Sequence, residues 1–361
     1  MNRAMLDFYT NVLLSSFSRV SATRAGALTD NVVSHDRVTR FLRERQLSSR
    51  DLWFSVKHLV EWIKSPEAVL VVDDTIVAKP YMDESPIICW FYDHTKGHAV
   101  KGMNLLSVVY HSLGTTLPVG YEIVKKTKSV VDEKTGEERR VSEQTKNDLF
   151  RRQVTRCAKN MPFRSVISDV WFASAENMMF VRHVVKKHFV MPVKSNRKVA
   201  LSGTDKRSGK YVTVEDVFTT RTGCRLRVFL EGVDFPLILI RRVFKNEDDS
   251  HGILYLVTSD TTLTEDAIVD LYQKRWKVEE YHKALKQQCA LGHSPARTVR
   301  TQSSHVFCSL WAFVKLELLH MSTGASYEGI KLRIYFNALK TSFNQVLLLD
   351  PFQWSGKPVF A

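Results

Sequence analysis

The feature that most limits the fold is a change of hydrophobic period near residue 68. Before it, apolar residues recur at helical spacing, as in 38–42 and again in 52–63. After it, short apolar runs of strand length alternate with amphipathic helical segments; examples of these runs are 68–77, 165–172 and 189–195. Strands that alternate with helices predict a mixed α/β layer, a sheet flanked by helices.

The same pattern divides the chain into five segments. Each is defined by its predominant period: 1–65, a helical N-terminal domain; 66–195, the first part of an α/β core; 196–250, an inserted antiparallel β unit without a helical run; 251–320, the second part of the core, with a long helix from Thr264 to about Cys289; and 321–361, a C-terminal tail that ends irregularly. The charged stretch 125–140 is predicted to be a loop.

The charge balance points to a polyanionic partner. The 361 residues include 52 Lys and Arg against 38 Asp and Glu, which gives a formal net charge of +14. Nucleic acid is the commonest reason for such an excess, and an anionic membrane surface is the next. The arginines of 37–45 fit a small DNA-binding helical module, although a solvated helix face explains them equally well. The 44% hydrophobic content is enough for a substantial core.

Cysteine usage and the apolar runs predict a soluble cytoplasmic protein. The five cysteines are odd in number, and no two form a Cys-x-x-Cys pair, which argues against a disulfide framework and against a zinc ribbon. The first twenty residues contain no signal-peptide core, and the apolar runs, such as 235–240, are far shorter than a membrane span. His94 and His98 have a metal-like spacing but no third ligand nearby, so a DNA-facing turn is the better interpretation.

Two apolar strands end in acids, which is unusual for buried strands. The run 68–77 contains Asp73 and Asp74, and the run 165–172 contains Asp169. A single acid in such a place is commonly a helix cap or a turn residue. Because ligands of open α/β sheets bind at the carboxyl ends of the strands, the two acidic strand ends together favour a functional site.

A third acid lies on the predicted long helix. Tyr272, Arg275, Glu279 and Lys286 fall on one stripe roughly 60° wide when residues advance by about 100° each. An ion pair between Arg275 and Glu279 on a solvated helix would explain part of this stripe. It would not explain the exposed aromatic rings of Tyr272 and Trp276.

Three carboxylates of this kind suit phosphodiester cleavage. In-line displacement at phosphorus is served by two divalent ions about 3.5–4 Å apart. Mg²⁺ prefers carboxylate oxygens and needs few protein ligands. The interpretation therefore assigns one acid of the Asp73-Asp74 pair, Asp169 and Glu279 as catalytic metal ligands, and it assigns phosphate contacts to the basic residues beside Glu279.

These residues resemble a known family. The spacing Tyr-x2-Arg-x3-Glu-x6-Lys of Tyr272, Arg275, Glu279 and Lys286 is similar to the signature of one large group of DDE transposases from bacterial insertion sequences. Trp276 before the glutamate and 280–283 (Glu-Tyr-His-Lys) after it agree with the same group. Its first acid is followed by threonine, which points to Asp74, but Asp73 stays open as the alternative ligand.

The resemblance implies an RNase H-like core with a β insertion, two Mg²⁺ ions (Mn²⁺ as a substitute), and cut-and-paste transposition. It further implies binding to double-stranded DNA at terminal inverted repeats, target DNA as a second partner, and a homodimer on paired ends. Five residues are predicted to contact DNA: Tyr272, Arg275, His282, Lys283 and Lys286. An aromatic residue of the insertion, Phe218 or Phe229, would hold a flipped base, whereas Trp171 is interpreted as a core residue.

Three alternatives stay open at this point. The first is a metal-dependent endonuclease of the same fold that does not join strands. The second is a domesticated DNA-binding protein that has lost catalysis, which the presence of all three acids disfavours. The third is a recombinase with Tyr272 as nucleophile, which the strands of 68–125 oppose because that class is largely helical.

Overall fold

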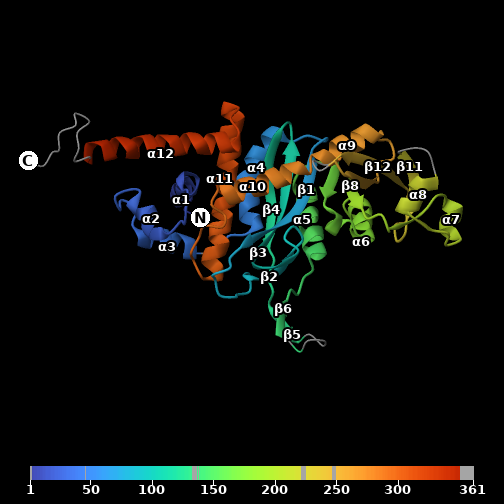
Figure 1. Cartoon of the computed structure of the whole chain (residues 1–361), viewed down its shortest axis with the longest axis horizontal. Coiled ribbons are helices and arrows are strands. Elements are labelled where there is room, and N and C mark those ends of the chain that lie inside the picture. Colours follow the sequence, from blue (N-terminus) through green and yellow to red (C-terminus); the bar gives the residue numbers. More distant parts are fainter. Residues whose placement is uncertain are drawn as a thin grey trace, which may run out of the picture.

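A mixed sheet crosses the molecule in the computed structural model, which describes residues 2–44, 46–131, 136, 138–220, 225–245 and 249–349 (Figure 1). Among these residues the sheet has eleven strands, in the order β10-β9-β11-β12-β13-β8-β7-β1-β3-β2, with β4 paired to β3. The strands are β1 Val69–Ala78, β2 Cys89–Asp93, β3 His98–Ser112, β4 Thr115–Ile123, β7 Ser165–Ser168, β8 His188–Val193, β9 Lys198–Ala200, β10 Val212–Thr213, β11 Arg225–Leu230, β12 Leu237–Lys245 and β13 His251–Thr258. The predicted α/β fold is confirmed.

The centre of the sheet combines parallel and antiparallel pairs. β1 pairs with β7 in parallel and β7 with β8 in parallel, whereas β1 and β3 are antiparallel. The parallel pairs require crossovers, and helices α5 Lys146–Asn160 and α6 Ala175–Met179 lie in these connections. Helix α5 begins at a capping box between Thr145 and Asp148, and its apolar side packs against β3 and β4.

The N-terminal helices share the core of the sheet. They are α1 Arg3–Ser15, α2 Ala22–Ala27, α3 His35–Glu44 and α4 Ser49–Ile63. Helix α4 packs on β4, while α1 and α3 pack on the long helix α11 Val299–Thr323 (Figure 1). Their buried side chains belong to the same apolar cluster as the sheet. The predicted helical N-terminal segment is therefore confirmed as secondary structure, and it is continuous with the core in its packing.

Helix α11 corrects the expectation that all apolar runs are of strand size. Of the helices in the described part of the chain, it is the one long and apolar enough to cross a membrane, with a mean hydropathy of 1.2. In this structure 61% of that window is buried inside the protein, as in the core helix of a globular domain. The cytoplasmic location stays a prediction.

The insertion is antiparallel as expected, but it extends the main sheet. Strands β9 to β12 continue from β13 toward one edge of the sheet (Figure 1). The prediction that 196–250 lacks helices is wrong, because α7 Gly203–Arg207 and α8 Val214–Thr220 lie within it. The start of α8 is stabilised by Thr213, whose Oγ1 accepts a hydrogen bond from the Asp216 amide and donates to the Asp216 carboxylate. The β-branched residues of 212–217 favour a strand, and this local cap outweighs them.

Two further expectations need correction. The stretch 125–140, predicted to be a loop, contains the antiparallel hairpin β5 Lys128–Val131 and β6 Glu138–Val141, which hangs below the sheet in Figure 1. The tail 321–361 contains helix α12 Tyr327–Leu349, which projects away from the sheet. Residues 350–361 lie outside the described part of the chain, as do Arg45, Arg221 and Cys224. Cys89, Cys157, Cys289 and Cys308 are free and buried.

The long helix predicted from Thr264 to about Cys289 is broken in the middle. The structure has α9 Glu265–Gln273 and α10 Trp276–Gln287, with a turn at 274–275. The turn is held by hydrogen bonds from the Lys274 amide to the Leu271 carbonyl and from the Arg275 amide to the Tyr272 carbonyl. These bonds span three residues, so the backbone tightens locally and the axis changes.

Candidate active site

The two acids of β1 point to opposite faces of the sheet. Successive side chains of a strand alternate in direction, so only one of Asp73 and Asp74 can face helix α10. Asp74 Oδ2 accepts a hydrogen bond from Asn104 Nδ2 at 2.6 Å and pairs with Lys146 Nζ at 2.7 Å. Lys146 begins α5, so the Asp74 carboxylate is directed to the α5 side.

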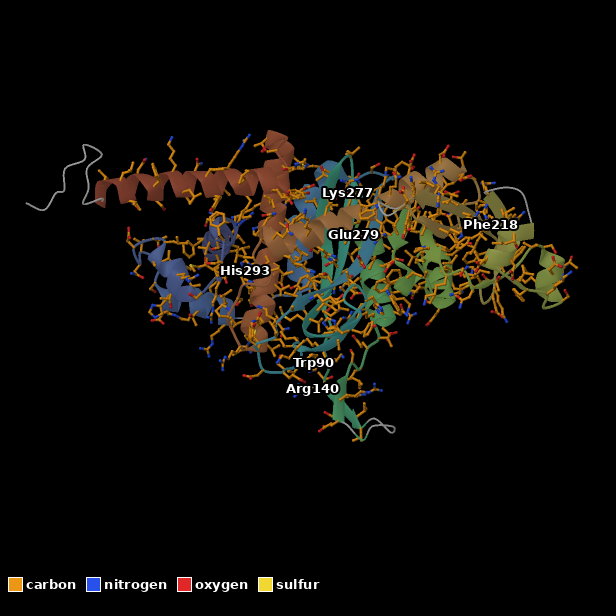
Figure 2. The ribbon with its side chains drawn as sticks, in the orientation of Figure 1. Trp90, Arg140, Phe218, Lys277, Glu279 and His293 are labelled. Atoms are coloured by element: carbon orange, nitrogen blue, oxygen red, sulfur yellow. The ribbon has the colours of Figure 1, made fainter. Side chains whose placement is uncertain are left out.

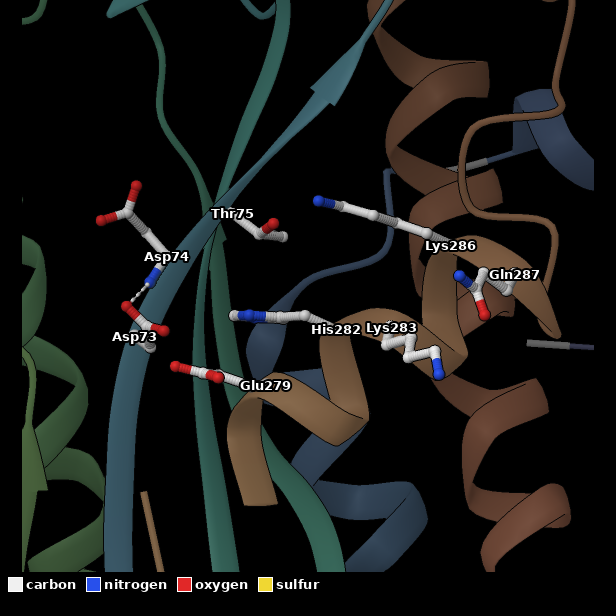
Figure 3. Close-up of a pocket in the computed structure, with 8 residues that line it drawn as sticks. All are labelled: Asp73, Asp74, Thr75, Glu279, His282, Lys283, Lys286 and Gln287. Atoms are coloured by element: carbon white, nitrogen blue, oxygen red, sulfur yellow. Dashed lines mark hydrogen bonds between the residues drawn. The ribbon is translucent and has the colours of Figure 1, made fainter. Parts of the chain in front are cut away.

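Asp73 faces the other side, where α10 lies. Figure 3 shows the carboxyl groups of Asp73 and Glu279 turned toward one another, while Asp74 points away from α10. The pKa of Asp73 is raised to about 7, first by burial and then by the negative charges of Asp74 and Asp169. The Arg275 guanidinium and the Asp74 backbone amide oppose this rise. Asp73 is thus close enough to Asp169 and Arg275 for their charges to affect its pKa.

Asp169 reaches the same place through the parallel pairing of β1 and β7. Val72 is the register partner of Ser168, so Asp73, in the middle of β1, and Asp169, directly after β7, follow neighbouring residues of adjacent strands. Asp169 then serves as the residue before a 3-10 turn, Val170–Phe172. The prediction that the first strand ends at its acids is wrong, because β1 continues to Ala78, but the predicted proximity of the first-strand acids to Asp169 agrees with this register.

Glu279 lies on the first turn of α10 and forms an ion pair with Arg275. The distance from Arg275 Nη1 to Glu279 Oε1 is 2.5 Å, so the ion pair expected for a plain solvated helix is present. Arg275 is not simply an exposed partner of Glu279, however, because burial and several neighbouring charges act on its pKa. Burial alone would lower its pKa, but the charges of Tyr272, Glu279, Asp73 and Asp169 raise it. Burial also raises the pKa of Tyr272 to about 12.

These groups line one open cavity of about 940 Å³. Its walls come from β1, the β2–β3 turn, the start of α5, the turn after β7, and α10. The lining includes Asp73, Asp74, Asp169, Arg275, Glu279 and Lys286. A smaller adjoining cavity, shown in Figure 3, is lined by β1 and by the side chains of α10 from Glu279 to Gln287. Residues as far apart in sequence as Asp73 and Glu279 are therefore brought together.

The basic residues predicted to contact DNA are differently disposed. Lys286 lines both cavities, and Arg275 lines the larger one. Lys283 lines only the smaller cavity, and its ammonium pairs with Glu328 of α12 at 2.6 Å. His282 has only 6% of its surface exposed, and burial lowers its pKa to about 3. A neutral, buried imidazole is a poor phosphate ligand, so the DNA contact predicted for His282 does not agree with its environment.

The aromatic residues also differ from expectation. Phe218, one candidate for holding a flipped base, is 5% exposed and stacks on Tyr255 beneath Arg241. Figure 2 shows it in the insertion, well separated from Glu279. Phe229 is half-buried under Lys206. Trp171, interpreted from sequence as core, is 51% exposed and lines the large cavity.

Sequence reasoning missed Asn104 and Lys146, the two partners of Asp74. Asn104 is fully buried in the middle of β3, where a polar residue in an apolar run could have signalled a buried partner. Lys146 follows the Thr145 cap of α5 and carries no signal of its own in the sequence. Its role depends on where the end of α5 meets β1.

The comparison with known families decides the identity at a coarse level. A family model described as DDE superfamily endonuclease matches residues 1–211 of the chain. The chain belongs to this family. The match contains Asp73, Asp74 and Asp169 and ends before Glu279. A search of curated proteins found no match. The DDE endonuclease family agrees with the mixed sheet seen here and with the RNase H-like fold expected from the sequence.

Family membership makes the protein a transposase-like nuclease with DNA as its substrate, and such enzymes typically use divalent metal ions. The donor chemistry fits a hard cation, because Asp73, Asp169 and Glu279 are carboxylates, and the negative charges of Asp74 and Asp169 contribute, after burial, to the raised pKa of Asp73. Among the described residues, no group of three or more His, Cys, Asp or Glu side chains is close enough to hold one ion together. His94 and His98 belong to no such group either.

Proposed function

We propose that this DDE endonuclease is a transposase that binds the terminal inverted repeats of an insertion sequence and catalyses Mg²⁺-dependent cleavage and strand transfer. The observation that carries the proposal is the shared cavity of Asp73, Asp169 and Glu279, with Arg275 and Lys286 on its wall. The Tyr-x2-Arg-x3-Glu-x6-Lys spacing of the sequence adds support, because it joins the third acid to the basic residues of the same cavity.

We further propose Asp73, in place of the Asp74 predicted from sequence, as the first metal ligand. Asp73 faces Glu279 and is influenced by Asp169, whereas the Asp74 carboxylate is occupied by Lys146 and Asn104. Asp74 would then act as a positioning residue, since its backbone amide donates to Asp73 Oδ1 at 2.8 Å. Its negative charge also holds Lys146 at the edge of the cavity.

In this proposal Asp73, Asp169 and Glu279 hold the metal ions, two in number. Mg²⁺ keeps several waters and takes one or two protein carboxylates, so three acids spread over one cavity suffice. When bound, the ions supply Lewis-acid stabilisation and an activated attacking oxygen. Arg275 would turn from Glu279 to the phosphate, because a guanidinium binds two phosphate oxygens at once. Lys286 would bind the same strand, and the Tyr272 hydroxyl would donate to it.

The test is cleavage of DNA that carries the element's own ends, taken from the DNA flanking the coding sequence. The wild type is compared with Asp73→Asn, Asp74→Asn and Glu279→Gln in Mg²⁺. Asp73→Asn and Glu279→Gln are expected to bind the ends and to lose cleavage by at least about a thousandfold, a loss of the size found when a catalytic group is removed. Asp74→Asn should lose cleavage by only about 10- to 100-fold, because a residue that positions a metal ligand contributes less than the ligand itself.

The matched control is Glu280→Gln. Glu280 is the next residue on α10, is 52% exposed and pairs only with Lys277 among the ion pairs of the described residues, so cleavage should be unchanged. If Asp74→Asn abolishes cleavage and Asp73→Asn does not, the first ligand is Asp74. If the ends are released but never joined to a second DNA, the protein is an endonuclease without strand transfer. If Glu279→Gln kept full activity, the proposed mechanism with Glu279 as a metal ligand would be wrong.

We also propose that the protein works as a homodimer, with α12 as part of the contact. Helix α12 projects from the body in Figure 1, and its exposed apolar residues alternate in steps of four and three: Leu332, Phe336, Leu339, Phe343 and Val346. This is the spacing of a coiled-coil seam.

Sedimentation of the free protein and of its DNA complex tests this contact. Phe336→Glu combined with Phe343→Glu should shift the wild-type dimer to monomer. Asn337→Glu introduces the same charge at an exposed polar position of α12 and should leave the dimer intact. A doubly substituted protein that sediments like the wild type would exclude this face as the dimer contact.

A further inference from the structure

A further cavity lies along the junction of β1 and α10, beyond the carboxylates. The smaller cavity of Figure 3 is walled by 73–75 of β1 and by α10. The further cavity is walled by 78–82, the end of β1 and the residues after it, and by residues of 292–297, the loop after α10. Gly292 packs against Val77, so this loop stays on β1 beyond the end of α10. The two cavities therefore follow one another along the same strand.

This further cavity, of about 430 Å³, is lined by cations and by no acid. Its charged lining residues are Arg19, Lys79 and Arg297, and among the described residues neither an aspartate nor a glutamate lines it. The remaining lining is largely apolar and includes Tyr81 and Met82. Positive side chains that gather without counter-charges repel one another, and a bound anion removes that repulsion. The cavity is therefore suited to an anionic ligand.

Lys79 is the buried cation of this cavity, with 5% of its surface exposed. Its Nζ donates to the Gly292 carbonyl at 2.6 Å and to the Ser294 carbonyl at 2.9 Å, which ties the loop after α10 to the end of β1. An ammonium has three donors, and the third has no acceptor in the described part of the chain. Burial lowers the pKa of Lys79 to about 8, so most of the molecules still carry this charge at neutral pH. A ligand that accepts the third hydrogen bond would complete the site.

The two arginines of the cavity are exposed and weakly engaged. The Arg297 side chain is 83% exposed, and its one ion-pair partner among the described residues, Asp83, lies 3.8 Å away and is 90% exposed. An exposed pair of this kind is weak. The Arg19 side chain has no hydrogen-bond or ion-pair partner in the described ranges. It belongs to the connection between α1 and α2, so the N-terminal helices contribute one of the two guanidinium groups that are available to a ligand.

The distance between the cavity and the carboxylates follows from the strand that joins them. From residue 73 to residue 79 the chain advances six steps in extended conformation, because the Lys79 backbone amide still donates to β3, at 2.8 Å. At about 3.3 Å per residue this is roughly 20 Å. His293 of the cavity wall lies on the side of Glu279 nearer the N-terminal helices in Figure 2, and its carbonyl accepts from the Val20 amide at 3.0 Å. Because duplex DNA rises about 3.4 Å per base pair, the two sites are roughly six base pairs apart.

We propose that Arg19, Lys79 and Arg297 form a second phosphate site, which binds a backbone phosphate of the cleaved DNA about six base pairs from the scissile bond. The two guanidinium groups donate to the phosphate oxygens from the exposed side, and the Lys79 ammonium donates from the buried side. The site contacts no base, so it fixes the position of the duplex relative to the carboxylates and selects no sequence. It rests on the proposed function, since it requires DNA in the catalytic cavity.

Neutralising single phosphates of the DNA tests this site without cleavage. The probe is a duplex of the element's own end in which one phosphate at a time is replaced by an uncharged methylphosphonate, and binding is measured in EDTA. The wild type should lose about tenfold in affinity at a position roughly five to seven base pairs from the scissile bond. Arg19→Gln combined with Arg297→Gln should bind the unmodified duplex about tenfold more weakly, with the slope of log affinity against log salt reduced by about two. This doubly substituted protein should not respond to the methylphosphonate at that position.

Lys159→Gln is the charge control. Lys159 is an exposed cation in the last turn of α5, and it lines neither this cavity nor the two beside the carboxylates. Its affinity for the end and its response to each methylphosphonate should match those of the wild type. If the doubly substituted protein binds the end as tightly as the wild type, or still responds to the same methylphosphonate, the proposal is wrong.

Two further outcomes separate this site from other sources of phosphate and from the proposed activity. If inorganic phosphate stabilises the wild type against urea more than the doubly substituted protein, while no methylphosphonate position depends on the two arginines, the cavity holds a free anion and the DNA contact is excluded. A wild type that shows the arginine-dependent phosphate but never cuts DNA in Mg²⁺ would keep the second phosphate site and lose the proposed transposase activity. Cutting and joining without such a phosphate would do the reverse.

Discussion

Acid should weaken the junction between the N-terminal helices and α11, because this junction contains a buried neutral histidine. His305 of α11 is fully buried. Its Nε2 lies 3.0 Å from the Ala290 carbonyl, which can only accept, so Nε2 carries the proton. Its Nδ1 then accepts from the Tyr9 hydroxyl of α1, also at 3.0 Å. Burial, assisted by Lys79, lowers the pKa of His305 to about 4.

The sign and size of the effect follow from this pKa. Between pH 6.5 and 4 the unfolded chain binds a proton at residue 305 that the folded protein does not, so stability falls as the pH falls. At pH 5 the solution lies about 1.5 pH units below the pKa of 6.5 that His305 has in the unfolded chain. The free energy of unfolding is therefore about 2 kcal/mol lower than at neutral pH. His111 and His282 also have lowered pKa values, about 4 and about 3, and add losses in the same direction.

The assay is urea unfolding at pH 7 and pH 5. The wild type should lose more stability between the two pH values than His305→Gln, by about 2 kcal/mol, because glutamine keeps a donor and an acceptor but does not titrate. His35→Gln removes an exposed histidine and should match the wild type. The same pH difference in the wild type and in His305→Gln would refute the reasoning. So would an NMR titration of the wild type that gives His305 a pKa of 6.5 or higher.

Three further changes have expected outcomes. Lys79→Met should lower the free energy of unfolding by about 1–3 kcal/mol in urea melts, because Lys79 Nζ donates to the buried carbonyls of Gly292 and Ser294 at 2.6 and 2.9 Å; an unchanged midpoint would contradict this. Gly102→Ala should destabilise β3 by about 1–3 kcal/mol, since its Cβ would lie 2.3 Å from the Val77 carbonyl oxygen, while Gly203→Ala meets nothing closer than 3.9 Å and serves as control. Equal melting of these two proteins would count against the close packing of β1 and β3. Lys286→Ala should weaken both DNA binding and cleavage by about tenfold, measured by titration and single-turnover kinetics, a milder loss than for Glu279→Gln; normal binding would mean that Lys286 does not contact the strand.

Much of the fold could be predicted because it depends on local periodicity. The alternation of apolar strand runs and amphipathic helices after residue 68 requires a mixed sheet with helices around it, and that sheet is present. The errors arose where a few hydrogen bonds outweigh periodicity. Thr213 and Asp216 start a helix within a segment rich in β-branched residues, and a tight turn at 274–275 divides a helix whose apolar pattern continues without interruption.

The tertiary structure decided which acid of the pair Asp73 and Asp74 faces the other carboxylates of the site. The sequence by itself determined the residue types: two strand-end acid positions, and a glutamate spaced with tyrosine, arginine and lysine. It did not determine whether Asp73 or Asp74 faces Glu279, because both lie in the same strand and differ only in the face they occupy. That choice depends on which side of β1 receives α10 and which receives α5, a matter of packing between segments far apart in the chain.

The same physical reason accounts for His282 and Trp171. His282 lies within the motif of α10 and is buried. Trp171 follows an apolar strand and is exposed in the cavity beside His94. Exposure is set by the neighbours that the fold supplies from distant segments, and no local spacing encodes them. The sequence therefore determined the chemistry available to the site, and the tertiary structure alone decided which of those side chains meet there.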